Sequence, residues 1–263
     1  MTSPTLTVMI NAARKAARGL QRDFGEVENL QVSMKGPANF VTKADQRTEA
    51  ILQGELTKAR PSFGLLMEEA GAVAGRDGEH RWLVDPIDGT TNFIHGIPHF
   101  AISIALERSG TVVAGVIYNP ISNDLFTAER GRGAFLNDRR LRVAARRELS
   151  EAVIGCGIPH LGRGDQVQFG KELARLQPKV AGVRRFGAAA LDLAWVAAGR
   201  MDGYWERGLA AWDIGAGILL VREAGGRAED IGGGDPLVTG DVLAGNDHIV
   251  EALKGEIVAA QQA

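Results

Sequence analysis

The stretch Asp85-Pro86-Ile87-Asp88-Gly89-Thr90-Thr91-Asn92-Phe93 is the most informative part of this sequence. It follows residues 81–85, a short apolar run that predicts a buried strand. In α/β proteins, sites are often placed where a strand ends in a tight turn and a helix begins. Pro86 fixes one backbone φ angle, and Gly89 allows a ligand to approach the backbone closely. The stretch therefore predicts a functional turn.

Two carboxylates on this turn indicate what the site binds. Asp85 and Asp88 lie three residues apart, so both side chains can converge on one point. Hard divalent cations prefer oxygen ligands of this kind. The N–H groups of Gly89 and Thr90 would open a helix, where an anion is stabilised. Metal ligands beside a phosphate-binding backbone indicate phosphoryl chemistry. The alternative is an Asx-type turn that only caps a helix.

The composition is that of an ordinary globular protein. Of 263 residues, 45% are hydrophobic and 24% are charged. The net charge is −2. A protein that binds nucleic acid or a membrane normally carries an excess of basic residues, so we expect neither partner. Cys156 is the single cysteine, which excludes an intrachain disulfide. With no secretory signal at the N-terminus, a cytoplasmic location is expected.

Outward from the motif, helical and strand patterns alternate. Such alternation predicts an α/β or α+β fold with layered sheets and helices. Short β-prone runs over residues 99–143, separated by turn residues, predict an antiparallel meander. Residues 34–37 are a loop signal, and 152–156 predict a strand. Helices are expected over 4–24, from about 42 to 59, near 165–176, over 188–198 and 213–224, and after 247.

The nine-residue stretch resembles the DPxDGTxNF signature of the inositol monophosphatase family. Further matches to that family follow in order along nearly the whole chain. They are Thr42-Lys43-Ala44-Asp45 after Lys35-Gly36-Pro37, Glu68-Glu69 beginning 17 residues before Asp85, Gly131–Phe135, and Trp212-Asp213 at the start of a helix. Taken alone, Glu68-Glu69 could be a solvated acidic pair, Asp213 a helix N-cap, and Thr42 with Asp45 a capping box.

The resemblance implies the fold. Family members are five-layer αβαβα sandwiches that form homodimers. We therefore expect one domain over residues 1–263, with an antiparallel sheet in the N-terminal half (about 1–145) and an α/β half over about 146–263.

The resemblance also implies a Mg²⁺ site. Glu68, Asp85 and the carbonyl of Ile87 would bind a first ion. Asp85, Asp88 and Asp213 would bind a second, with Asp85 as the bridge. Four carboxylates in one pocket repel one another unless cations are present. The ions would polarise a phosphate ester and lower the pKa of a bound water.

The remaining site residues divide between catalysis and substrate binding. Thr90, hydrogen-bonded to Asp45, resembles the family's water-activating pair, and Glu68 belongs to the same catalytic group. The substrate contacts that the resemblance implies are Gly89, Thr90, Gly187, Ala189, Glu206 and Asp213. Glu206 would bind hydroxyls of the alcohol, although it could instead be a surface carboxylate paired with Arg207 or a nearby lysine.

The implied function is Mg²⁺-dependent, lithium-sensitive hydrolysis of inositol monophosphate to inositol and phosphate. Relatives with the same ligands hydrolyse histidinol phosphate, fructose-1,6-bisphosphate or 3′-phosphoadenosine nucleotides, and the first two stay open here. A function of another class is also open, because some bacterial relatives are partners of the transcription machinery. Three basic pairs could serve such a contact or be solvated surface charge: Arg139-Arg140, Arg146-Arg147 and Arg184-Arg185.

Overall fold

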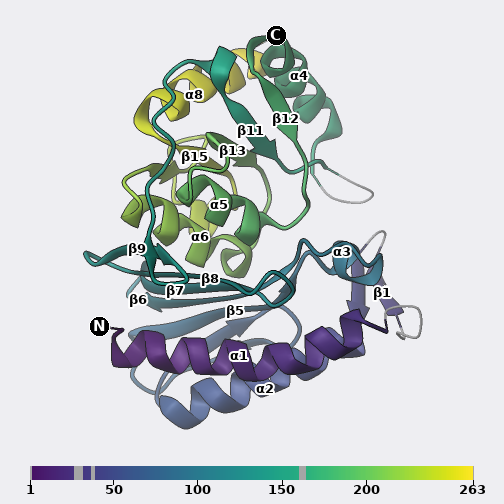
Figure 1. Cartoon of the computed structure of the whole chain (residues 1–263), viewed down its shortest axis with the longest axis vertical. Coiled ribbons are helices and arrows are strands. Elements are labelled where there is room, and N and C mark those ends of the chain that lie inside the picture. The colour runs from purple at the N-terminus through teal and green to yellow at the C-terminus, as the bar shows by residue number, and fades with distance from the viewer. Residues whose placement is uncertain (1, 27–31, 37–38, 160–163, 263) are drawn as a thin grey trace.

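Two β-sheets alternate with layers of helices in this protein. The structure, a computed structural model, describes residues 2–26, 32–36, 39–159 and 164–262. Figure 1 shows the order of layers: α1 and α2, the larger sheet, α5 and α6, the smaller sheet, then α4 and α8. The bounds of these helices are Pro4–Phe24, Lys43–Ala59, Ala189–Ala197, Ala211–Glu223, Gln166–Leu176 and Asp247–Gln261. The layered αβαβα fold is confirmed.

The outer helices α1 and α2 cover one face of the larger sheet. In α1 the apolar positions recur every three or four residues, and that stripe is buried against the sheet. Ser3 caps α1 by accepting a hydrogen bond from the Leu6 N–H at 3.2 Å. Thr42 caps α2 in the same way. Both helices have the predicted extents.

The larger sheet has the order β10-β9-β8-β7-β6-β5-β3-β4. Its strands are β3 (Gly64–Met67), β4 (Gly71–Val73), β5 (His80–Asp88), β6 (Ala101–Arg108), β7 (Thr111–Asn119), β8 (Asp124–Glu129), β9 (Gly133–Leu136) and β10 (Arg139–Arg140). Strands β6 to β10 form the predicted antiparallel meander, and β5 pairs antiparallel with β6. Strand β5 is longer than predicted, because Asp88 still pairs with Ala101 after an irregular register at Asp85.

A hairpin replaces the loop that was predicted after α1. Strand β1 (Val32–Gly36) pairs antiparallel with β2 (Asn39–Thr42). Pro37, which carried part of the loop signal, lies outside the described residues. The loop prediction was therefore wrong for residues 34–36, which lie in β1.

The smaller sheet has the order β12-β11-β13-β15-β14. Its strands are β11 (Val153–Cys156), β12 (Gly182–Arg184), β13 (Gly203–Glu206), β14 (Arg227–Glu229) and β15 (Val242–Gly245), and short helices include α3 (Thr90–Ile94) and α7 (Pro236–Thr239). Helices α5 and α6 are apolar on nearly all sides because they lie between the two sheets. Within the described chain, no helix is long and apolar enough to cross a membrane.

Candidate metal and phosphate site

Asp85 and Asp88 lie at the carboxyl end of strand β5 in the larger sheet. Both side chains are buried, with 2% and 8% of their surface exposed. The Ile87 N–H donates to Asp85 Oδ1 at 2.9 Å, which fixes that carboxylate. The irregular register between Asp85 and Asp88 turns the backbone, so this segment is the end of a strand and not the free turn that the sequence indicated.

The start of α5 closes over this strand end. The Ala190 N–H donates to Asp88 Oδ2 at 2.7 Å, across 102 residues of sequence. Gly89 has a φ of 92°, and a Cβ atom there would lie 3.1 Å from both the Ala188 Cβ and the His99 carbonyl oxygen. Gly187 and Ala189 flank Ala188, so these two predicted substrate residues lie beside the motif. Glycine is needed at position 89 for both conformation and space.

Two further carboxylates come from other elements. Glu68 follows β3, and its N–H donates to the Val84 carbonyl oxygen at 3.2 Å. Asp213 lies in the first turn of α6, where its Oδ2 accepts the Ala210 N–H at 2.8 Å. Asp213 is the third residue of α6, so its interpretation as the N-cap was wrong by three positions.

Electrostatics indicate that these four carboxylates form one cluster. Burial raises the pKa of Asp85 well above its usual range, and the negative charges of Glu68, Asp88 and Asp213 raise it further. The pKa of Asp88 is raised by burial first and then by the charge of Asp213. Backbone N–H donors stabilise the ionised forms only in part. Burial and mutual repulsion therefore disfavour the ionised forms of Asp85 and Asp88.

The donor set fits a divalent cation. Oxygen ligands, negative charge and carboxylates oriented by hydrogen bonds are what hard divalent cations prefer. Among the described residues, no three carboxylate, histidine or cysteine side chains already stand in the arrangement of a formed metal site. The fit therefore rests on the chemistry and the charge of the four carboxylates.

Asp45 lies in the first turn of α2 and joins the cluster through Thr90. It is fully buried. Its Oδ2 accepts from the Thr42 N–H at 2.8 Å and from the Thr42 hydroxyl at 2.6 Å. Its Oδ1 accepts from the Thr90 hydroxyl at 3.2 Å, and Thr90 also lies 3.1 Å from the Ile87 carbonyl oxygen. The capping box and the Asp45–Thr90 pair are therefore both present.

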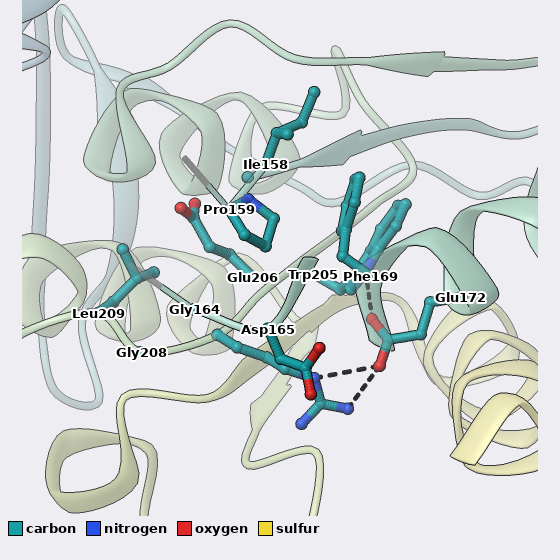
Figure 2. Close-up of a pocket in the computed structure, with 12 residues that line it drawn as sticks. Ile158, Pro159, Gly164, Asp165, Phe169, Glu172, Trp205, Glu206, Gly208 and Leu209 are labelled. Carbon is teal, nitrogen blue, oxygen red and sulfur yellow. Dashed lines mark hydrogen bonds and ion pairs between the residues drawn. The ribbon is translucent and has the colours of Figure 1, made fainter. Parts of the chain in front are cut away.

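Glu206 ends β13 and lines a pocket of about 90 Å³ together with Pro159 and Leu209 (Figure 2). The Tyr204 hydroxyl donates to its carboxylate. A Cβ on Gly157 would lie 1.8 Å from the Glu206 carboxyl carbon, so only glycine leaves room for this side chain. Burial raises the pKa of Glu206 to about 7. Arg207 pairs instead with Glu172 and Asp241, so the alternative partner for Glu206 was wrong.

Sequence reasoning missed two residues that support the site. Glu49, four residues after Asp45 on α2, accepts from the Glu69 and Ala70 N–H groups at 2.8 Å each. It thereby holds the turn that carries Glu68, and its spacing from Asp45 was the available signal. Asn92 donates to the carbonyl oxygens of His99 and Phe186 at 2.8 Å, which joins the motif to the segment before α5.

The raised pKa of Glu206 predicts how stability depends on pH. Its ordinary value is 4.5, so the folded protein binds this proton more tightly than the unfolded chain does. That contribution is fully present below about pH 4.5 and is lost as pH rises through about 7. In EDTA, the free energy of unfolding of Glu206→Gln should therefore fall less than that of the unsubstituted protein between pH 5 and pH 8. Urea unfolding of both measures this, and parallel curves would contradict it.

Comparison with known proteins assigns this arrangement to a family. A profile of the "Inositol monophosphatase family" matches residues 1–263. The "Inositol-1-monophosphatase" of Mesorhizobium japonicum is 64% identical over 252 residues, covering 95% of each chain. The "Nus factor SuhB" of Escherichia coli K12 is 42% identical over 251 residues, covering 95% of this chain and 94% of that protein.

Solved structures agree in fold. The extragenic suppressor protein suhB of Bartonella henselae superposes with a TM-score of 0.94 at 57% identity, over 97% of this chain and 98% of that one. The IMPase TM1415 of Thermotoga maritima superposes with a TM-score of 0.89 at 31% identity, over 99% of both chains. Since the match extends over the whole chain in both sequence and fold, this protein is a member of the inositol monophosphatase family.

Proposed function

We propose that this protein is a Mg²⁺-dependent phosphatase that hydrolyses inositol monophosphate to inositol and phosphate. The observation that carries the proposal is the cluster of Glu68, Asp85, Asp88 and Asp213, whose charges raise the pKa of Asp85 and Asp88. Family membership and relatives named inositol-1-monophosphatases at 60% and 64% identity support the substrate class.

Two sets of ligands share Asp85 in this proposal. Glu68, Asp85 and the Ile87 carbonyl would hold one Mg²⁺, and Asp85, Asp88 and Asp213 would hold another. When bound, Mg²⁺ supplies positive charge that polarises the phosphate ester and lowers the pKa of water. The protein orients these ligands through the backbone N–H groups of Ile87, Ala190 and Ala210.

Thr90 and Asp45 are proposed to handle the proton of the attacking water. The Thr90 hydroxyl donates its own proton to Asp45 Oδ1, so its oxygen can accept one from water. Glu68 lies in the same cluster and helps to orient the water. The N–H groups of Gly89 and Thr90 are proposed to bind phosphate oxygens, since Gly89 has no side chain to exclude them.

The alcohol is proposed to lie between Asp213, Glu206 and the segment Gly187–Ala189. Ala188 and Ala189 offer no hydroxyl for hydrogen bonding, so Glu206 is the main polar contact from this side. Phosphate release with Mg²⁺ should be faster from inositol 1-phosphate than from histidinol phosphate or fructose-1,6-bisphosphate. A clear preference for either of the latter would replace the proposed substrate.

Glu206→Gln should raise KM for inositol 1-phosphate about tenfold and leave KM for 4-nitrophenyl phosphate nearly unchanged. A carboxylate accepts hydrogen bonds from ring hydroxyls more strongly than an amide does. The small ester has no hydroxyls near this position. Steady-state kinetics on both substrates test the role, and equal losses would remove Glu206 from the substrate site.

Lithium should inhibit uncompetitively at millimolar concentrations. Li⁺ is close to Mg²⁺ in size but carries half the charge, so it offsets the charges of Asp85, Asp88 and Asp213 less completely. Rates are compared in LiCl and KCl at the same ionic strength, because simple screening would be equal in both salts. Identical rates up to tens of millimolar would refute lithium sensitivity and leave the phosphatase proposal intact.

The chain is proposed to act as one domain, as a homodimer and in the cytoplasm. The basis for all three is the family resemblance. Sedimentation of the purified protein tests the dimer, because a monomer at micromolar concentration would contradict it.

A second candidate function is a contact with the transcription machinery. The six arginines of the pairs at 139–140, 146–147 and 184–185 are exposed, and Arg146 also pairs with Asp202 at 2.9 Å. A relative at 42% identity is named a Nus factor. If the contact exists, Asp88→Asn should co-purify transcription proteins as well as the active enzyme does, and loss of co-purification with activity would refute an independent role.

A further inference from the structure

Strand β13 presents alternate side chains to two different regions. Tyr204 is buried in the core shared with α5 and α6, and it donates to Glu206. Trp205 is buried in the core beneath α4 and α8, and Arg207, two residues further on, also contacts α4. This period of two follows from strand geometry. One face of the strand end therefore serves the site, and the opposite face is anchored in the outer helix layer.

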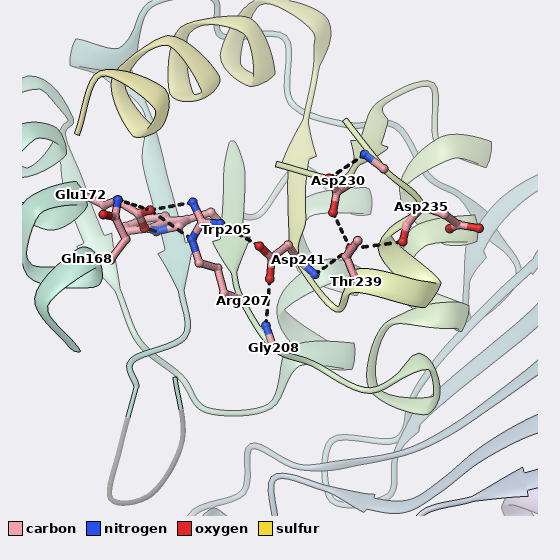
Figure 3. A network of polar contacts seen from close by, with 10 residues as sticks. Gln168, Glu172, Trp205, Arg207, Gly208, Asp230, Asp235, Thr239 and Asp241 are labelled. Atoms are coloured by element: carbon pink, nitrogen blue, oxygen red, sulfur yellow. Dashed lines mark hydrogen bonds and ion pairs between the residues drawn. The ribbon is translucent and has the colours of Figure 1, made fainter. Parts of the chain in front are cut away.

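The anchor on α4 is Glu172, a carboxylate with only 1% of its surface exposed. Its Oε2 accepts from Trp205 Nε1 at 3.1 Å. Its Oε1 accepts from two Arg207 nitrogens, at 3.1 and 2.7 Å, and from Gln168 at 3.1 Å. Figure 3 shows these side chains converging. A buried carboxylate with this many donors is held in one position.

A second carboxylate fixes the other side of Arg207. Asp241, immediately before β15, accepts from the third guanidinium nitrogen at 2.7 Å. Its other oxygen accepts the Gly208 N–H at 3.1 Å (Figure 3). Arg207 thus joins α4, the end of β13 and the start of β15. We call Arg207, Glu172 and Asp241 the clamp.

The bonding of the guanidinium argues against a role in binding phosphate. All three of its nitrogens donate to carboxylates within the protein. Arg207, the central residue of the clamp, immediately follows Glu206. The chain then continues into α6, which carries Asp213. Figure 2 shows Glu172 and Glu206 as separate carboxylates of one pocket, with Trp205 between them. Because the guanidinium nitrogens are bonded to Glu172 and Asp241, the clamp holds the backbone that carries Glu206, although Arg207 and Glu172 also line the pocket.

We propose that Arg207 is a positioning residue that holds the end of β13 so that the Glu206 carboxylate is preset for the hydroxyls of a polyhydroxylated alcohol. The proposal rests on the proposed function of Glu206. Because the clamp does not touch the reacting phosphate, it governs affinity for the alcohol and leaves the chemical step alone.

Arg207→Lys is the sharpest variant, because an ammonium keeps the charge but cannot bridge two carboxylates with a planar fork. KM for inositol 1-phosphate should rise about tenfold, with kcat and KM for 4-nitrophenyl phosphate changed less than about twofold. Asp241→Asn weakens the same clamp from its other side and should change KM in the same direction. Arg227→Lys is the matched control, since Arg227 also bridges two carboxylates, Glu229 and Glu251.

A double-mutant cycle separates positioning from general destabilisation. In a Glu206→Gln background, Arg207→Lys should cause less than about a twofold further rise in KM, because its effect passes through Glu206. Independent multiplication of the two effects would overturn the proposal, as would equal losses on both substrates or an equal effect of Arg227→Lys. Failure of the unsubstituted enzyme to hydrolyse inositol 1-phosphate would instead refute the proposed function.

Discussion

Asp88→Asn should leave a folded protein whose kcat at saturating Mg²⁺ is about a thousandfold lower. Asp88 is held from two sides. It is the last residue of β5, and its carboxylate accepts the Ala190 N–H of α5 at 2.7 Å. An amide oxygen can still accept that hydrogen bond, so the local structure is retained. The negative charge that offsets a cation is lost.

The fold of this variant should be at least as stable as that of the parent when metal is removed. The pKa of Asp88 is raised by burial and by Asp213, so ionised Asp88 destabilises the metal-free protein near neutral pH. Asp202→Asn is the matched control. Asp202 lies away from the site, is buried, and accepts a hydrogen bond from the Val153 N–H at 2.8 Å. Near-parental turnover of Asp88→Asn would show that Asp88 is not a ligand.

The part of the candidate site on the Asp85–Phe93 stretch could be predicted because its signals are short and local. The strand end, the glycine and the two aspartates lie within one stretch of sequence, where backbone geometry decides which groups can converge. Helix α1 was predictable for a related reason: its apolar stripe, Pro4 and Gly25 are all local signals. The role of a residue can be predicted from the sequence when it depends on residues nearby in the chain.

The other parts of the site depend on contacts that only the fold creates. The bond from Ala190 to Asp88 joins residues 102 apart, and no local pattern at Ala190 indicates it. Gly157 is needed because Glu206 occupies the space where its Cβ would lie. The continuation of β5 to Asp88 depends on pairing with Ala101, which overrides the turn signal of Pro86 and Gly89. These features are tertiary, so sequence alone left them open.

The Asp45 carboxylate is proposed to have two roles: it caps α2 through Thr42 and takes part in catalysis through Thr90. Asp45 Oδ2 serves the helix cap through Thr42, and Oδ1 faces Thr90. Burial raises the pKa of Asp45, while its hydrogen bonds to Thr42 lower it. If capping were its only role, losing the charge would affect stability and leave catalysis intact. The two oxygens therefore allow the roles to be tested separately.

Asp45→Asn should lower kcat about a hundredfold and lower the free energy of unfolding by only about 1 kcal/mol. The amide oxygen can still accept the Thr42 N–H, so α2 keeps most of its cap. The amide nitrogen would face Thr90 and donate to it, so the Thr90 oxygen would lose the acceptor that lets it take a proton from water. Thr42→Ser is the control, since it keeps the hydroxyl that bonds Asp45 and should keep activity. Turnover and urea unfolding are measured on both variants, and an Asp45→Asn enzyme with lower stability but full kcat would assign Asp45 to the cap alone.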